Sequence, residues 1–246
     1  MLSVINGFEY GEFCSKQYGI IITSPPHYVV PERDLDTISI PGRLGDIVLD
    51  NGRYKNVTIS YSCAIISRED YQLRKAITGM IRDLEVTAQY KRLRDSYNHN
   101  CFRMARISGG LNFSSIMEQV GEFTLTFDCK PQRFLDAGEY IQEIVNGDSV
   151  VNYTEQISKP LINIYGSGPG ELNVGGTTIK ILALEDEITI DCEVMNAYRQ
   201  VADSPPENKN GDIHAPVFPE LIPGENEISW TGGIERIEVI PRWWML

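Results

Sequence analysis

Hydrophobic and polar residues alternate along several short segments of the chain, which is the pattern of half-buried β-strands. The alternation is clearest at 57–65, 123–129 and 188–194, where every second residue is apolar. Glycine, proline, asparagine and aspartate residues, which favour turns, separate these segments. The pattern therefore predicts a mainly β fold.

One segment departs from the alternation. From about Arg68 to about Ile81, apolar residues recur at steps of three and four, which predicts a helix with one apolar face. After it, 84–90 and 102–107 are predicted strands that flank a polar turn at 95–100. We therefore expect an otherwise β-rich first half to contain one helix.

Turn signals are densest at 38–54, where the sequence reads ISIPGRLGDIVLDNGRY. Proline presets one turn dihedral and glycine permits positive φ, so Pro41-Gly42, Gly45-Asp46 and Asn51-Gly52 each predict a reversal of the chain. By residue chemistry alone, this segment is a tight loop between strands and contains no catalytic group.

The second half predicts a further series of short strands that begins at 161–165. The glycine-rich segment 166–170 is expected to turn the chain, and Gly175-Gly176 and Gly232-Gly233 each predict a hairpin. Regularly spaced short strands without a helical period are typical of a β-sandwich.

Between these two halves the periodicity weakens, and Gly138 and Asn146-Gly147 interrupt it. We therefore predict a first domain at 1–135, a linker region at 136–159 and a second domain at 160–246. Residues 1–135 carry 16 basic and 15 acidic side chains, whereas residues 136–246 carry 6 and 19. The excess of acidic residues in the second half argues against a nucleic-acid-binding surface there, because phosphate contacts require Lys and Arg.

The overall composition is that of an ordinary globular protein, with 42% hydrophobic and 23% charged residues among 246. No apolar run is long enough to span a bilayer and no signal peptide is recognised, so we expect synthesis in a cytoplasm and no membrane partner. Of the five cysteines, Cys63, Cys129 and Cys192 fall on apolar strand positions, which predicts reduced core residues.

Candidate chemistry is sparse. His27, His99 and His214 lie far apart in polar or proline-rich loops, and no nucleophile, nucleotide or metal motif accompanies them. We therefore expect no enzyme activity, no cofactor and no metal site. A small hydrolase would require acids and histidines that converge, and the sequence offers no such set.

The three tryptophans, Trp230, Trp243 and Trp244, all lie in the second domain and are the candidate carbohydrate contacts. Aromatic rings stack on sugar faces, but large rings more often pack in a core or anchor a chain end. Both interpretations stay open at this point.

Several motifs resemble, in order, those of distal tail proteins, the hub components of long non-contractile bacteriophage tails. In the first half they are the segment at 38–54, YKRLRD at 90–95, FRMAR at 102–106 and FDCKP at 127–131. In the second half they are KP at 159–160, YGSG at 165–168, NVGG at 173–176, ITIDC at 188–192, FPELIPGENEISW at 218–230 and IPRWW at 240–244.

This resemblance implies an N-terminal tail-tube-like β-domain that forms a ring, followed by a C-terminal galectin-like β-sandwich. It further implies a structural hexamer at the virion tail tip, assembled in the bacterial host cytoplasm. Implied partners are the major tail tube protein on one face and the tail-associated protein on the other, with receptor-binding or baseplate proteins in some members. DNA would pass the lumen without specific binding. The alternative function is a carbohydrate-binding module that contributes to host adsorption.

Overall fold

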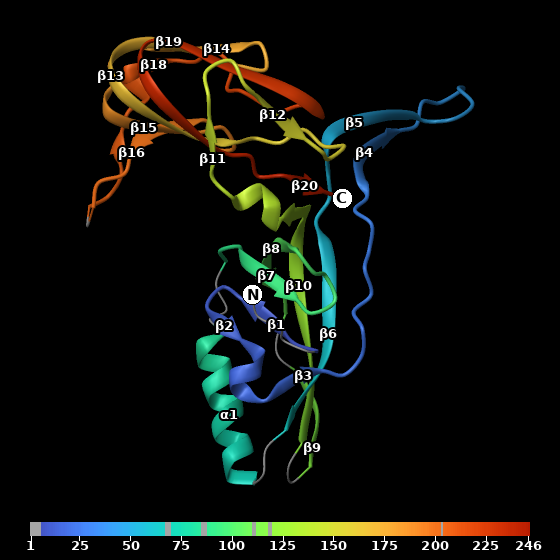
Figure 1. Ribbon diagram of the computed structural model, residues 1–246. Coiled ribbons are helices and arrows are strands. Elements are labelled where there is room, and N and C mark those ends of the chain that lie inside the picture. Colours follow the sequence, from blue (N-terminus) through green and yellow to red (C-terminus); the bar gives the residue numbers. More distant parts are fainter. Residues whose placement is uncertain (1–5, 67–69, 85–87, 110–111, 118–119, 203) are drawn as a thin grey trace. The chain divides into compact units, whose positions relative to one another are not determined.

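The computed structural model describes residues 6–66, 70–84, 88–109, 112–117, 120–202 and 204–246. These residues divide into two compact units, 1–133 together with 246, and 134–245. Each unit is built on antiparallel strands around a hydrophobic core of its own (Figure 1). The predicted mainly β fold is confirmed, with a single α-helix among the described residues.

The main sheet of the first unit has the strand order β2-β1-β7-β8-β10-β6-β3, and β9 pairs with β10. A separate two-stranded sheet joins β4 and β5. The elements of this unit are β1 (Phe8–Tyr10), β2 (Phe13–Cys14), η1 (Ser15–Tyr18), β3 (Ile20–Ile22), β4 (Arg33–Ile38), β5 (Ile47–Tyr54), β6 (Val57–Ile66), α1 (Asp70–Asp83), β7 (Lys91–Asp95), β8 (Cys101–Ile107), β9 (Asn112–Met117) and β10 (Val120–Leu135).

Aromatic rings fill the centre of the first core. The Phe8 ring lies 5.7 Å from that of Tyr61 and 6.0 Å from that of Phe127, measured between centroids. The alternation of buried and exposed residues over 57–63 of β6 places Tyr61 on the buried face of the sheet, as the sequence predicts. Met80 and Leu84, at the end of the helix, are fully buried in the same core.

The helix predicted at 68–81 is α1, although residues 67–69 lie outside the described part of the chain. The strand predicted at 84–90 is wrong for the residues that can be judged. The Leu84 N–H donates to the Met80 carbonyl at 2.8 Å, so Leu84 closes the helix, and the next strand begins only at Lys91. Leu84 is four residues after Met80, so the same apolar residue fits both a helical face and the start of an alternation; residues 85–87 are not described.

The second unit arranges its strands in the order β11-β19-β13-β15-β16-β17, while β12 pairs with β19, and β14 joins β13 to β18. Its elements are η2 (Asp136–Glu139), β11 (Gln142–Ile144), β12 (Ser149–Asn152), β13 (Leu161–Val174), β14 (Thr177–Ile181), β15 (Glu185–Asp191), β16 (Asn196–Arg199), β17 (Glu207–Asn208), η3 (Asn210–Asp212), β18 (Ile213–His214), β19 (Gly224–Ile240) and β20 (Trp244–Met245).

Two of the predicted turns in this unit are wrong. Segment 166–170 lies inside the continuous strand β13, and Gly232-Gly233 lies inside β19. The two strands pair along both halves, with a register shift between Gly166 and Gly170, so the glycines mark a bend. A Cβ on Gly233 would lie 1.9 Å from the Ser167 carbonyl oxygen, which leaves room only for glycine. The hairpin predicted at Gly175-Gly176 joins β13 to β14 and is confirmed.

Residues 136–159, predicted as a linker region, contain two short strands. β11 pairs with residues 237–239 of β19, and β12 pairs with residues 224–227 of the same strand. Strands of three and four residues are too short to give a clear alternation, so the sequence shows only weak periodicity here. In the part of the chain that the structure describes, no helix has the length and apolar character needed to cross a membrane.

Candidate assembly surface

The β4–β5 hairpin, hereafter the arm (residues 33–54), forms a two-stranded sheet of its own, separate from the main sheet of the first unit (Figure 1). The register pairs Thr37 with Val48 on one face and Asp36 with Leu49 on the other, so both faces carry apolar side chains. Leu44 at the tip is 100% exposed. The exposed apolar residues of the arm are Leu35, Ile38, Ile40, Leu44, Val48 and Leu49. The arm therefore carries an apolar surface that stays largely exposed in the part of the chain that the structure describes.

Ionic contacts hold the two strands of the arm together. The Arg33 guanidinium contacts both oxygens of Asp50, with Nε at 3.0 and 2.9 Å, and its plane lies over the Tyr54 ring. Arg53 Nε lies 2.7 Å from Asp34 Oδ2. Exposed pairs of this kind add little stability singly, and both join β4 to β5 in the register that the backbone pairing sets.

The turn signals at 38–54 are partly confirmed. Gly42 and Gly45, at φ +82° and +79°, form the tip between β4 and β5, as predicted. Asn51-Gly52 is not a turn, however, because both residues lie within β5. Gly52 has a φ of +71° beside a register shift, so the sequence Asn-Gly marks a bulge here.

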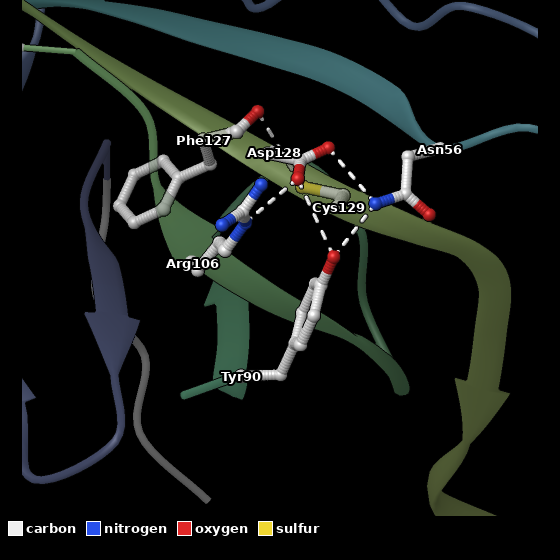
Figure 2. Close-up of polar contacts among 6 residues, drawn as sticks. All are labelled: Asn56, Tyr90, Arg106, Phe127, Asp128 and Cys129. Carbon is white, nitrogen blue, oxygen red and sulfur yellow. Dashed lines mark hydrogen bonds and ion pairs between the residues drawn. The ribbon is translucent and has the colours of Figure 1, made fainter. Parts of the chain in front are cut away.

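A polar cluster around Asp128 lies where the arm returns to the main sheet (Figure 2). Asn56, two residues after β5, donates from Nδ2 to Asp128 Oδ1 at 3.0 Å and to the Tyr90 hydroxyl at 2.7 Å. Arg106 Nε donates to Asp128 Oδ2 at 2.8 Å. Burial raises the pKa of Asp128, but the hydrogen bonds from Arg106 and Asn56 outweigh it and lower the pKa below its ordinary value. The Asp128 side chain, 18% exposed, is thus a stable carboxylate.

A second carboxylate, that of Asp95, accepts a hydrogen bond from the segment that leads into the arm. The Tyr28 hydroxyl donates to Asp95 Oδ1 at 3.3 Å, and the Tyr61 hydroxyl donates to Asp95 Oδ2 at 2.7 Å. Burial and the Asp95 charge raise the pKa of Tyr28, which keeps its hydroxyl protonated as a donor. Backbone N–H groups of Tyr97 and Asn98 also donate to Asp95 Oδ1, at 2.9 and 2.8 Å. Sequence analysis missed both carboxylates, because no local motif distinguishes them.

The structure places the three tryptophans in different environments. Trp243 is 4% exposed and belongs to the second core. Trp244 donates from Nε1 to the Ile157 carbonyl at 2.8 Å, and Trp230 packs partly buried against the core. Trp243 therefore presents little ring surface, and carbohydrate contact by Trp230 or Trp244 stays a prediction.

The Pro-Arg-Trp segment has a structural explanation. Arg242, at a φ of +56°, donates from its two terminal nitrogens to Asp191 at 2.7 and 2.9 Å. Its N–H donates to the Gly138 carbonyl at 2.7 Å, and a Cβ on Gly138 would lie 2.2 Å from Trp243 N. This clamp fixes the segment that buries Trp243.

Titratable groups in the described part of the chain bear on two kinds of chemistry, metal binding and thiol reactivity. The described residues include no group of three or more His, Cys, Asp or Glu placed to hold a metal ion. All five cysteines are free, and burial raises the pKa of Cys63, Cys129 and Cys192 to about 12. The core positions predicted for these three cysteines are confirmed.

Comparison with known proteins finds one matching family model and several structures of similar fold. Residues 14–129 match the model of the phage tail protein RIFT-related domain. The solved structure of Dit (gp 19.1) from phage SPP1, described as a paradigm of hub adsorption apparatus in phages that infect Gram-positive hosts, has a similar fold. That comparison gives a TM-score of 0.73 at 11% identity, over 98% of this chain and 99% of that chain.

Two structures of the phage P2 baseplate in its activated conformation, one with Ca and one with Sr, contain a chain of similar fold. Each gives a TM-score of 0.56 at 9% identity, over 95% of this chain and 97% of that chain. No curated protein sequence matches this chain. The predicted resemblance to distal tail proteins is confirmed, by a sequence match over residues 14–129 and by fold over nearly the whole chain.

Proposed function

We propose, on the premise that residues 14–129 are a phage tail protein RIFT-related domain, that this chain is a structural hub protein of a phage tail tip. Its fold is shared with Dit of phage SPP1, a protein of a hub adsorption apparatus, and with a chain of the phage P2 baseplate. The role is one of assembly, without enzyme activity of its own.

The observation that carries this proposal is the exposed arm. A lone two-stranded hairpin is marginally stable in water, and an apolar surface on both of its faces favours contact with another chain. A second copy of this chain is a suitable partner, because a head-to-tail contact between identical chains closes into a ring when the rotation between them fits. Six copies would form the ring that the distal tail family predicts.

Within such a ring, one face would meet the tail tube protein and the other the tail-associated protein, with the lumen open to DNA. The second unit, with 6 basic and 19 acidic residues, would be unsuited to holding DNA. It is instead the candidate attachment point for receptor-binding or baseplate proteins. The location would be the tail tip of the virion, reached by assembly in the host cytoplasm.

The test is the absolute mass of the full-length protein, by light scattering after size exclusion over a range of protein and salt concentrations. A ring of six 27.7-kDa chains has a mass of about 166 kDa. That mass, or twice that mass for two stacked rings, would support the proposal, and electron microscopy would then show ring-shaped particles. A chain that stays monomeric when mixed with its tail tube and tail-associated proteins, and that binds glycans instead, would favour the carbohydrate-binding module.

A further inference from the structure

The two chain segments that flank the arm donate hydrogen bonds to different carboxylates of the main sheet. Tyr28, in the segment that enters the arm, donates to Asp95 at the end of β7. Asn56, in the segment that leaves it, donates to Asp128 on β10. Between these two points the segments join each other, since the Lys55 N–H donates to the Glu32 carbonyl at 2.8 Å. The base of the arm thus has three fixed points.

We infer that Asp95 and Asp128 are positioning residues that hold the arm in one direction before any partner binds. This inference rests on the proposed role of the arm in ring assembly. A flexible arm would lose conformational entropy when a partner orders it, and this cost would weaken binding. An arm that is already directed avoids most of that cost.

The geometry supports two tethers, the hydrogen bond from Tyr28 to Asp95 and the hydrogen bond from Asn56 to Asp128. Asp128 is held from three sides, by Asn56, by Arg106 and by the Tyr90 hydroxyl at 3.3 Å, so its carboxylate is fixed when Asn56 binds (Figure 2). Asp95 is likewise fixed by Tyr61 and by two backbone N–H groups of its own turn. Each carboxylate therefore offers a rigid acceptor to the donor in the segment that flanks the arm.

Two small substitutions remove the tethers without removing the carboxylates. Tyr28→Phe deletes only the donating hydroxyl. Asn56→Asp keeps the size of the side chain but replaces its donor by a second negative charge beside Asp128. Tyr153→Phe, at an exposed tyrosine, and Asn208→Asp, at an exposed asparagine, both in the second unit, are the matched controls.

Hydrogen exchange read by mass spectrometry measures how well the base of the arm is protected, independently of assembly. All variants carry Val48→Asp on the arm, and exchange is read at protein concentrations at which light scattering gives the mass of a single chain. We expect the amides of residues 30, 32, 33 and 53–56, including that of Lys55, to exchange about fivefold faster in Tyr28→Phe, the factor that one hydrogen bond of typical net strength supplies. The increase should be at least as large in Asn56→Asp, because Asn56 donates two hydrogen bonds. The two controls should leave these rates unchanged.

The pattern along the chain decides the outcome. An increase confined to the base of the arm, while β6 and β10 keep their protection, supports the inference. Unchanged rates at the base in both variants, or an increase spread equally over β6 and β10, would overturn it. A ring that fails to form while the base of the arm is protected would count against the proposed function alone, so the two failures are distinguishable.

Discussion

The side-chain amide of Asn146 pairs with both backbone groups of Trp230. The Trp230 N–H donates to Asn146 Oδ1 at 2.9 Å, and Asn146 Nδ2 donates to the Trp230 carbonyl at 2.9 Å. β11 pairs with β19 on one side of this point and β12 pairs with it on the other. Asn146 therefore continues the ladder across the gap between two short edge strands.

Replacing Asn146 by alanine should destabilise the second unit. Two hydrogen bonds are lost at a site open to water, which replaces them in part, so we expect a loss of about 1 kcal/mol in the free energy of unfolding. Urea denaturation followed by tryptophan fluorescence measures it, because all three tryptophans lie in this unit. Gln142→Ala, on the adjacent edge strand, is the control and should change stability far less.

Gly233→Ala should disrupt the bend shared by β13 and β19. The added methyl would lie 1.9 Å from the Ser167 carbonyl oxygen, so the two strands must move apart, at a cost above about 3 kcal/mol. Gly168→Ala provides the comparison, since Gly168 has a φ of +90° but nothing within 4 Å of a Cβ. It should cost only the backbone strain, about 1–2 kcal/mol. Equal losses in the two variants would contradict the close-approach explanation.

These glycines show where the sequence predicts the fold and where it does not. Alternation identifies β6 and β10 because each buries one face, and helical spacing identifies α1. Segment 166–170 and Gly232-Gly233 carry the composition of turns, yet each lies in a continuous strand. Glycine reports that the backbone needs freedom or space, and only the partner strand determines whether the result is a reversal or a bend.

The arm, too, is predicted by the sequence only in part. Turn residues at 41–46 predict the hairpin tip, but no sequence pattern indicates that the flanking apolar residues stay exposed. Asp95 and Asp128 become recognisable only when strands distant in sequence bring Tyr28 and Asn56 to them. A contact between residues 67 or 72 positions apart leaves no local periodicity.

The ion pair between Asp191 and Arg242 should make the second unit sensitive to acid. Burial raises the pKa of Asp191, but the Arg242 guanidinium outweighs it and lowers the pKa below the ordinary 3.8. A carboxyl whose pKa is lower in the folded state stabilises the fold above the unfolded pKa and loses that contribution as pH falls through the folded one. We therefore expect stability to fall below about pH 4.

Asp191→Asn provides the check, because it removes the titrating group and keeps its size. The variant should be less stable than the parent at pH 7, and the difference should shrink as the pH falls below 3.8. Urea midpoints from tryptophan fluorescence between pH 7 and 3 measure both quantities. A difference that is constant over this range would show that Asp191 does not titrate with folding.

Val48→Asp should separate assembly from folding. Val48 is an exposed apolar residue on one face of the arm, so a charge there leaves the first core untouched but would be buried without a counterion in a contact between chains. We expect the mass of the full-length protein to fall from that of the ring to 27.7 kDa, with an unchanged thermal midpoint for the separated chain. Ser62→Asp, at an exposed position of β6 opposite Thr124, is the control for an added charge and should still assemble. Assembly of Val48→Asp at the concentration of the parent would mean that the arm does not make the contact.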